Sequence, residues 1–213
     1  MSINITKEFL YDGFVILFGF LLGSLNFAIL ISKGTGNGDV RDYGSGNAGT
    51  SNVARTIGLK YAVVVLILDI LKGYIAAIVG RHFVPNDGAL LGGFGAILGH
   101  RYPIFFGMKG GKSVATYAGV LLGIDYRVAI CFAAAWLVVI LVSRYMALGA
   151  VLAVWVVPFA ANYFCPDFRS LRTYSIAVGW IIVSFHRVNI KRMRRHVEPK
   201  ASLKLHSKEE KYG

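Results

Sequence analysis

The distribution of apolar residues along the chain constrains its fold more than any other feature. Apolar runs separated by short polar or basic segments occupy most of the sequence, and several approach the roughly 20 residues that a helix needs to cross a bilayer. The runs cover residues 10–31, 61–80, 88–107, 114–124, 128–142, 146–164 and 174–185. This pattern predicts an all-α, polytopic integral membrane protein with about seven transmembrane helices.

Composition supports a membrane fold, although the number of spans stays open. With 55% hydrophobic and 16% charged residues, a soluble domain would lack the polar surface to cover its core. Runs 114–124 and 174–185 are short, so re-entrant or tilted pieces, and about five spans in all, are the alternative. The small residues of segment 90–99 predict close helix packing.

The basic residues, which give a net charge of +12, fall mainly on one side of the predicted spans. Placing the N-terminus outside puts sixteen Lys and Arg in inner segments and five in outer ones, as the positive-inside rule requires. We therefore expect an outer N-terminus, a cytoplasmic C-terminus and a multi-pass protein of the plasma membrane. The chain divides into a transmembrane domain, residues 1–190, and a basic, polar cytoplasmic tail, residues 191–213, partly disordered and able to lie on anionic lipid.

The segment from Asp39 to Arg55 has the residues of an anion-binding loop. Glycines allow close approach of the backbone to a ligand, and Arg41 and Arg55 can offer planar donor forks to phosphate oxygens. Its other candidate phosphate ligands are Ser45, Gly46, Asn47, Thr50 and Asn52. The glycine spacing imitates a dinucleotide-binding fingerprint, but no buried strand precedes it.

A second basic, glycine-rich loop begins at Lys109. The candidates here are Lys109, Gly110, Gly111, Lys112 and Thr116. The loop resembles the end of a nucleotide-binding P-loop, but the first glycine of that motif is absent because the position holds Phe106. Two such loops on one membrane face predict a site that handles two phosphates or one large phosphorylated ligand.

Three further groups complete the set of candidates. Asp69 and Lys72 lie three residues apart on one helix face and can pair, and His100 approaches the second loop, so we assign these three supporting roles. His186 and Asn189 share a face at the end of the last span and are a candidate catalytic pair. Cys131 and Cys165 stand alone, and we expect no disulfide, metal or cofactor.

These pieces, in this order, resemble the bacterial acyl-phosphate:glycerol-3-phosphate acyltransferases of the PlsY type. The resemblance rests on the following motifs: GSLNF (residues 23–27), GSGNAGTSNVAR (44–55), DILKG (69–73), GHRYPIFFGMKGGKSVAT (99–116) and HRVNI (186–190). It implies an inner-membrane enzyme with its site on the cytoplasmic face. Such an enzyme transfers a fatty acyl group from acyl phosphate to the 1-hydroxyl of sn-glycerol 3-phosphate, giving lysophosphatidic acid and phosphate in phospholipid biosynthesis.

The resemblance also assigns residues. The first-motif serine and arginine fall on Ser45 and Arg55, the phosphate-binding loop on Gly110 to Lys112, and the third-motif pair on His186 and Asn189. The candidate catalytic residues are therefore Ser45, Arg55, Lys112, His186 and Asn189. The resemblance implies the soluble enzyme that makes acyl phosphate as a further partner. The chain departs from the family at three places: the usual G-A-T-N is here Gly49 to Asn52, read as G-T-S-N, and Ser113 replaces the last glycine of the second motif K-G-G-K-G. The third is His196, which replaces the glycine two residues before Glu198 and leaves the role of Glu198 open.

Several alternatives remain open at this point. Ser45 is either a hydrogen-bond donor to phosphate, which we favour, or an acylated nucleophile. The proton of the attacking hydroxyl goes either to His186 or to a substrate phosphate. The alternative functions are a transporter of an organic phosphate or other anion, and a structural lipid-binding subunit.

Overall fold

The fold is entirely helical over the described residues. The structure, a computed structural model, describes residues 2–201, in which α-helices and two short 3-10 helices occur and no strand does. The helices are α1 (Ser2–Gly23), α2 (Phe27–Gly34), η1 (Val40–Asp42), α3 (Thr50–Thr56), α4 (Leu59–Phe83), α5 (Gly88–Arg101), η2 (Ile104–Phe106), α6 (Val114–Ile124), α7 (Tyr126–Ser143), α8 (Met146–Ala153), α9 (Val157–Phe164), α10 (Arg169–Phe185) and α11 (Arg187–Arg194). The predicted all-α fold is confirmed.

Fewer helices than predicted are long and apolar enough to cross a membrane singly. In the described residues, three segments meet that test: Lys7–Gly34, which is α1 continuing into α2, then α4 and α7. Helices α8 and α9, which are bent by 41° at a break, make a fourth only if the pair is taken as one span. Helix α6, with 11 residues, is about 16 Å long, well short of the roughly 30 Å hydrocarbon core. The total of about seven spans remains a prediction.

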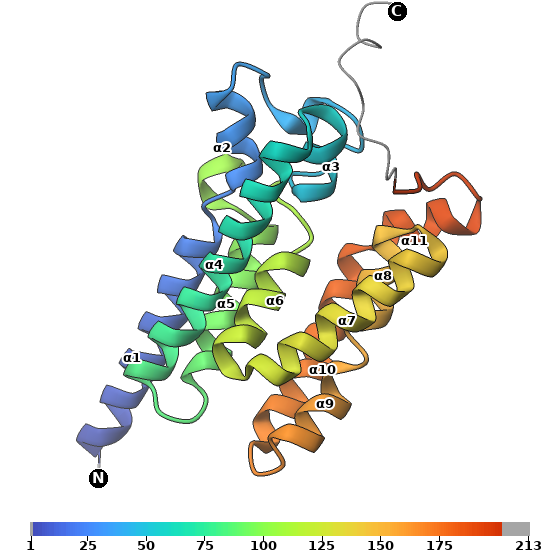
Figure 1. The fold of residues 1–213 in the computed structure, drawn as a ribbon. Helices are drawn as coiled ribbons and strands as arrows, with labels where there is room; N and C mark the ends of the chain where they lie inside the picture. Colours follow the sequence, from blue (N-terminus) through green and yellow to red (C-terminus); the bar gives the residue numbers. More distant parts are fainter. Residues whose placement is uncertain (1, 202–213) are drawn as a thin grey trace, which may run out of the picture.

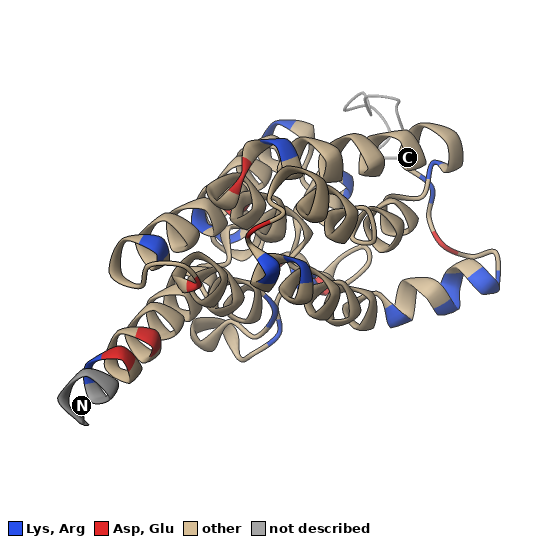
Figure 2. Cartoon of the chain, turned by 90° about the horizontal axis from the view of Figure 1, so that it is seen from below, with Lys and Arg blue, Asp and Glu red and all other residues tan. Residues whose placement is uncertain are grey.

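The glycine-rich loops lie at the same end of the bundle. In Figure 1, α2, α3 and α11 stand at the upper end, whereas the N-terminus and the turn between α4 and α5 lie at the lower end. Figure 2 shows Lys and Arg mainly on helix ends and connecting segments, and several of them on α11. The chain therefore collects both loops and the start of α11 at one end, as the charge pattern predicts.

Close contact between α1 and α5 fixes where α5 ends, at the end of the bundle that holds both loops. A β-carbon on Gly95 would lie 2.2 Å from the carbonyl oxygen of Ile16, and one on Gly99 would lie 2.1 Å from that of Phe20. No side chain fits at such distances, so the two backbones touch directly. The close packing predicted for segment 90–99 is confirmed, and it fixes the C-terminal end of α5, from which the second loop departs.

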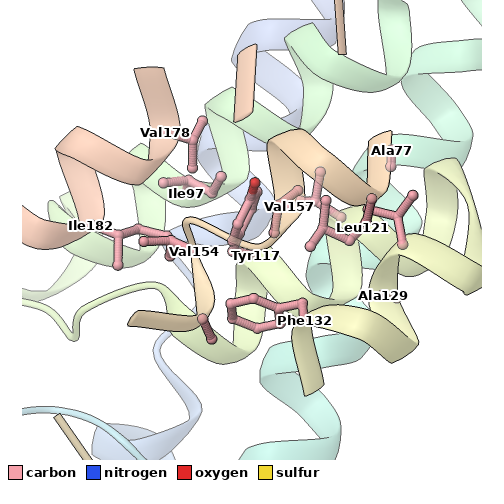
Figure 3. Packing of buried hydrophobic residues seen from close by; sticks show 14 of the residues in the cluster. Ala77, Ile97, Tyr117, Leu121, Ala129, Phe132, Val154, Val157, Val178 and Ile182 are labelled. Atoms are coloured by element: carbon pink, nitrogen blue, oxygen red, sulfur yellow. The ribbon is translucent and has the colours of Figure 1, made fainter. Parts of the chain in front are cut away.

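An aromatic and aliphatic core joins the first six helices to the later ones. Tyr117 of α6 and Phe132 of α7 meet edge to face with their ring centroids 5.5 Å apart, and Ile97, Val178 and Ile182 pack around them (Figure 3). Buried apolar contact of this kind supplies most of the packing energy between helices. Through this core, α10 and the following turn are held against α5 and α6.

Candidate active site

Asn52 holds the first loop in shape from within. Its side-chain oxygen accepts hydrogen bonds from the backbone N–H and the hydroxyl of Ser45, at 2.9 and 3.1 Å. Its amide nitrogen donates to the carbonyl oxygens of Val40 and Tyr43, at 2.8 and 3.0 Å. The side chain is 1% exposed. Asn52 therefore works inside the loop, and it orients the hydroxyl of Ser45.

Arg41 connects the first loop to the second. Its guanidinium forms a two-point contact with Asp39, Nε to Oδ1 at 2.9 Å and Nη2 to Oδ2 at 2.8 Å. Its Nη1 donates to the carbonyl oxygens of Phe106 and Lys109. The hydrogen bond from Arg41 lowers the pKa of Asp39 to about 2. The donor fork expected to face phosphate is thus engaged with protein groups in this structure, and Arg41 braces both loops.

The second loop lies directly on the C-terminal end of α5. The N–H of Gly110 donates to the carbonyl oxygen of Arg101 at 3.0 Å, and that of Gly111 to His100 at 3.1 Å. A β-carbon would lie 2.0 Å from the carbonyl oxygen of His100 at Gly110, and 2.0 Å from Nε2 of His100 at Gly111. These two N–H groups therefore cap α5. The N–H groups that α6 leaves free at its start, after Ser113, are the ones available to an anion.

Beneath the second loop lies a buried polar cluster. Lys72 Nζ is 2.8 Å from Asp69 Oδ1, which confirms the predicted pairing, and His100 Nδ1 is 3.5 Å from the same oxygen. Lys72 also donates to the carbonyl oxygen of Leu25 at 2.9 Å. All three charged or titratable side chains are at most 4% exposed. The ring of His100 supports Gly111 from below, so the cluster holds the loop from inside the bundle.

Lys112 joins the second loop to the turn between α10 and α11. Its Nζ donates to Asn189 Oδ1 at 2.5 Å, and Asn189 Nδ2 donates in turn to Glu198 Oε1 at 2.6 Å. Burial lowers the pKa of Lys112 to about 8, and the nearby charges of Arg192, Arg101 and Arg55 act in the same direction, against the charge of Glu198. A cation that is partly desolvated among other cations is prepared to bind an anion.

His186 stands at the same turn with its orientation fixed. Its Nδ1 is 2.8 Å from the carbonyl oxygen of Ile182, so Nδ1 carries the proton and Nε2 keeps a free lone pair. Burial, followed by the charge of Lys112, lowers the pKa of His186 to about 4. The imidazole is therefore neutral at physiological pH, ready to accept a hydrogen bond at Nε2.

The remaining candidates from the first loop differ in their exposure and in their distance from Lys112 and His186. Arg55 is exposed on α3 and close enough to Lys112 to affect its pKa. Gly46, with φ of 70°, is exposed, and Asn47 and Thr50 are half-buried. The two loops meet where a β-carbon on Gly111 would lie 2.8 Å from the carbonyl oxygen of Ala48. The structure thus brings the two predicted loops together.

Two candidates from the second loop lie away from this centre. The side chain of Lys109 is exposed, whereas its carbonyl oxygen accepts from Arg41. Thr116 is fully buried, with its carbonyl oxygen against Gly73 of α4. Thr116 therefore packs α6 onto α4, and in this structure it is further from the surface than a phosphate ligand is expected to be.

Two residues with contacts to the site were not among the candidates. Glu198 reaches Asn189 because the chain turns back after α11 at His196, whose φ is 58°. Arg101 donates to the carbonyl oxygen of Gly111 at 3.3 Å. The predicted boundary at residue 190 falls inside α11, and residues 202–213 of the predicted tail lie outside the described residues. The sequence signal for Glu198 was its place two residues after His196, where the family has glycine, and for Arg101 its position next to His100.

The comparisons with known proteins agree in both sequence and fold. Residues 13–196 match the family model described as glycerol-3-phosphate acyltransferase. A glycerol-3-phosphate acyltransferase of Brucella canis is 43% identical over 189 residues, which are 89% of this chain and 92% of that protein. A glycerol-3-phosphate acyltransferase of Mesorhizobium japonicum is 43% identical over 194 residues, which cover 89% of this chain and 95% of that protein.

Two solved structures have the same fold. The crystal structure of PlsY, an integral membrane glycerol 3-phosphate acyltransferase, in its glycerol 3-phosphate form is 36% identical with a TM-score of 0.83, over 90% of this chain and 96% of that one. The lysophosphatidic acid form is 35% identical with a TM-score of 0.80, over 89% and 94%.

Proposed function

This chain belongs to the glycerol-3-phosphate acyltransferase family, and we propose that its two glycine-rich loops and the turn holding His186 and Asn189 form the active site. The protein is an integral membrane acyltransferase of phospholipid synthesis that acts on glycerol 3-phosphate. The observation that carries the proposed site is the hydrogen bond between Lys112 and Asn189, which joins the second loop to that turn. The transporter reading is not favoured, because the relatives are named as acyltransferases.

We infer that the acyl donor is an acyl phosphate. Its leaving group is phosphate, so the reaction needs charge neutralisation and positioning more than a covalent intermediate. The cations around Lys112 supply the charge neutralisation, and the glycine loops supply the positioning. The 1-hydroxyl oxygen of glycerol 3-phosphate attacks the acyl carbonyl carbon. The bond from that carbon to the phosphate oxygen breaks, and phosphate leaves with the electron pair.

The proton of the attacking hydroxyl goes to a substrate phosphate oxygen in this mechanism. Phosphate monoesters titrate near pH 6, about two units above the pKa of about 4 at His186, so phosphate is the stronger base of the two. Nε2 of His186 accepts a hydrogen bond from the neighbouring 2-hydroxyl of glycerol 3-phosphate and so orients the acceptor, while the proton of the 1-hydroxyl stays free to go to phosphate. Asn189 holds Lys112 in place. The hydroxyl of Ser45, which donates to Asn52 Oδ1 in this structure, exchanges that bond for one to a substrate phosphate, in place of forming an acyl-enzyme.

Two assays test the activity and the role of His186. Purified protein in detergent, given acyl phosphate and glycerol 3-phosphate, should release phosphate and lysophosphatidic acid at equal rates. The absence of both products refutes the proposed donor. With folding confirmed, His186→Gln should retain more than about a tenth of the wild-type rate, because glutamine still hydrogen-bonds, whereas loss of a general base costs about a hundredfold or more.

We propose further that the site faces the cytoplasm across a bacterial inner membrane, within a domain of residues 1–190. The sixteen Lys and Arg in the predicted inner segments, which include both loops, against five in the outer ones support this orientation. In a variant without Cys131 and Cys165, a cysteine at Asn47 should react only with reagent on the cytoplasmic side. One at Asn86, at the opposite end, should react only from outside, and the reverse labelling refutes the orientation. Co-purification tests the proposed soluble partner, the enzyme that makes acyl phosphate.

A further inference from the structure

Arg101 occupies a position beside the second loop that the proposed mechanism does not use. It is the last residue of α5 and is half-buried. Its carbonyl oxygen accepts from Gly110 at 3.0 Å, and its Nη1 donates to the carbonyl oxygen of Gly111 at 3.3 Å. The guanidinium is therefore held against the loop that carries Lys112.

The guanidinium of Arg101 lies against aromatic rings and not against a carboxylate. Its guanidinium carbon lies 5.4 Å from the ring centroid of Tyr102 and 5.0 Å from that of Phe185, the residue before His186. These two rings meet edge to face, 6.1 Å apart. Among the described residues Arg101 has no ion pair within salt-bridge distance, and its buried Nε has no hydrogen-bond partner. Cation–π contact positions a guanidinium while leaving its donor edge available.

The surroundings of Arg101 carry more positive than negative charge. The charge of Arg101 contributes to the lowered pKa values of both Lys112 and His186. Arg55 and Arg192 act on Lys112 in the same sense, and Glu198 is the acid that acts against them. An arrangement of several cations around one carboxylate is stabilised when an anion enters.

An exposed apolar turn begins directly after this cation. Ile104, Phe105 and Met108 are 53%, 57% and 50% exposed, between Arg101 and Lys109 in the chain. An amphiphile with a charged head and a hydrocarbon chain matches a cation next to apolar surface. Acyl phosphate is such a molecule, whereas glycerol 3-phosphate has no hydrocarbon chain.

We propose that Arg101 is a further substrate-binding residue, which holds the phosphate of the acyl phosphate donor between the second loop and Phe185. The inference rests on the proposed function, since it concerns the donor of that same site. The donor's phosphate is also the group that leaves, so inorganic phosphate should compete with the donor for the same guanidinium.

Steady-state kinetics of Arg101→Gln in detergent tests the proposal. We expect the KM for acyl phosphate to rise about tenfold to a hundredfold, as for loss of a charge-assisted contact. The inhibition constant of inorganic phosphate, competitive against the donor, should rise by a similar factor, while the KM for glycerol 3-phosphate stays within about twofold. Arg101→Lys keeps the charge but loses the planar fork, so its donor KM should lie between those of the wild type and the glutamine variant.

Controls separate binding from structural damage. Arg81→Gln removes an exposed cation near the far end of α4 and should leave all three constants unchanged. Unchanged constants in Arg101→Gln, equal rises in both KM values, or a fall in kcat alone overturn the proposal, and if that variant does not fold, Arg101→Lys decides by the same constants. A wild-type protein that does not turn over acyl phosphate at all refutes the proposed function, which is a distinct result.

Discussion

The two glycine-rich loops at the site end of the bundle are held by different means. Side chains hold the first loop, through the hydrogen bonds of Asn52 and the contacts of Arg41 with Asp39 and the second loop. Backbone contact holds the second, where Gly110 and Gly111 lie on the end of α5 without room for a β-carbon. Single substitutions can therefore remove the contacts of the first loop one at a time. In the second loop, any side chain larger than glycine at these two positions displaces the backbone.

The largest effect should come from Gly111→Ala in the second loop. The new β-carbon would lie 2.0 Å from Nε2 of His100, so the loop or the histidine must move. A displacement of about 1 Å can cost about a hundredfold in rate, so kcat/KM should fall at least that much. Gly49→Ala is the matched variant in the first loop, because φ there is −155° and the new β-carbon would meet only the end of the Asn47 side chain, at 3.0 Å. Equal losses in the two variants would contradict the comparison.

Lys112→Ala should have the next largest effect. It removes a charge-assisted contact of about 1.5–3 kcal/mol, so kcat/KM should fall about tenfold to a hundredfold. Thermal unfolding in detergent should change little, because the lysine is destabilised by its own burial. Near-normal kinetics would remove the second loop from the proposed site.

The pKa of Lys112 predicts opposite trends for activity and stability at alkaline pH. Its value of about 8, lowered from 10.5, means that the free enzyme loses the charge as pH rises through 8, so kcat/KM should fall there. The unfolded chain keeps the proton up to about 10.5, so this group makes stability rise between those limits. Lys112→Arg should abolish both trends at this site, and their persistence would assign them to another group.

Asn52→Ala should weaken the first loop by a moderate amount. It removes hydrogen bonds to Ser45, Val40 and Tyr43 and leaves buried groups unpaired, a cost of about 1–3 kcal/mol in unfolding free energy. The KM for phosphorylated substrates should rise because Ser45 loses its orientation. A change in stability with unchanged kinetics would show that the first loop does not reach the substrates.

The smallest effect should come from Ser113→Gly. Ser113 has φ of 62°, a left-handed conformation that costs a side-chain-bearing residue about 1 kcal/mol. Its hydroxyl donates to the carbonyl oxygen of Ile97 at 2.7 Å, a bond worth a similar amount. The glycine variant should therefore melt close to the wild type, whereas Ser113→Ala, which loses the bond and keeps the conformation, should melt lower. Equal melting temperatures of all three proteins would mean that neither the backbone strain nor the hydrogen bond to Ile97 affects stability.

The sequence predicted what depends on composition and order, namely a helical membrane fold with both loops at one end. It did not predict the break at residues 154–156, although Pro158 within an apolar run signals a helix start. Nor did it predict that the N–H groups of Gly110 and Gly111 cap α5, because that depends on how the chain leaves the helix.

Two of the three departures from the family motifs have a common explanation in the structure. Ser113 and His196 stand where the family has glycine, and both adopt the left-handed backbone that glycine accepts readily. The backbone path is therefore kept at both positions although the residue type differs. The consequence at His196 is that Glu198 still reaches Asn189, a contact that the sequence alone left open.

The glycine contact between α1 and α5 also bears on how the chain enters the membrane. Helix α5 has 14 residues, about 21 Å in length, and its glycines offer little hydrocarbon to lipid. Such a segment gains little free energy by entering the lipid without another helix beside it. We expect α1 to be in the bilayer first and to act as an internal chaperone for α5, so that a bulky residue at Gly95 would appear in cells as a defect of biogenesis before any defect of catalysis.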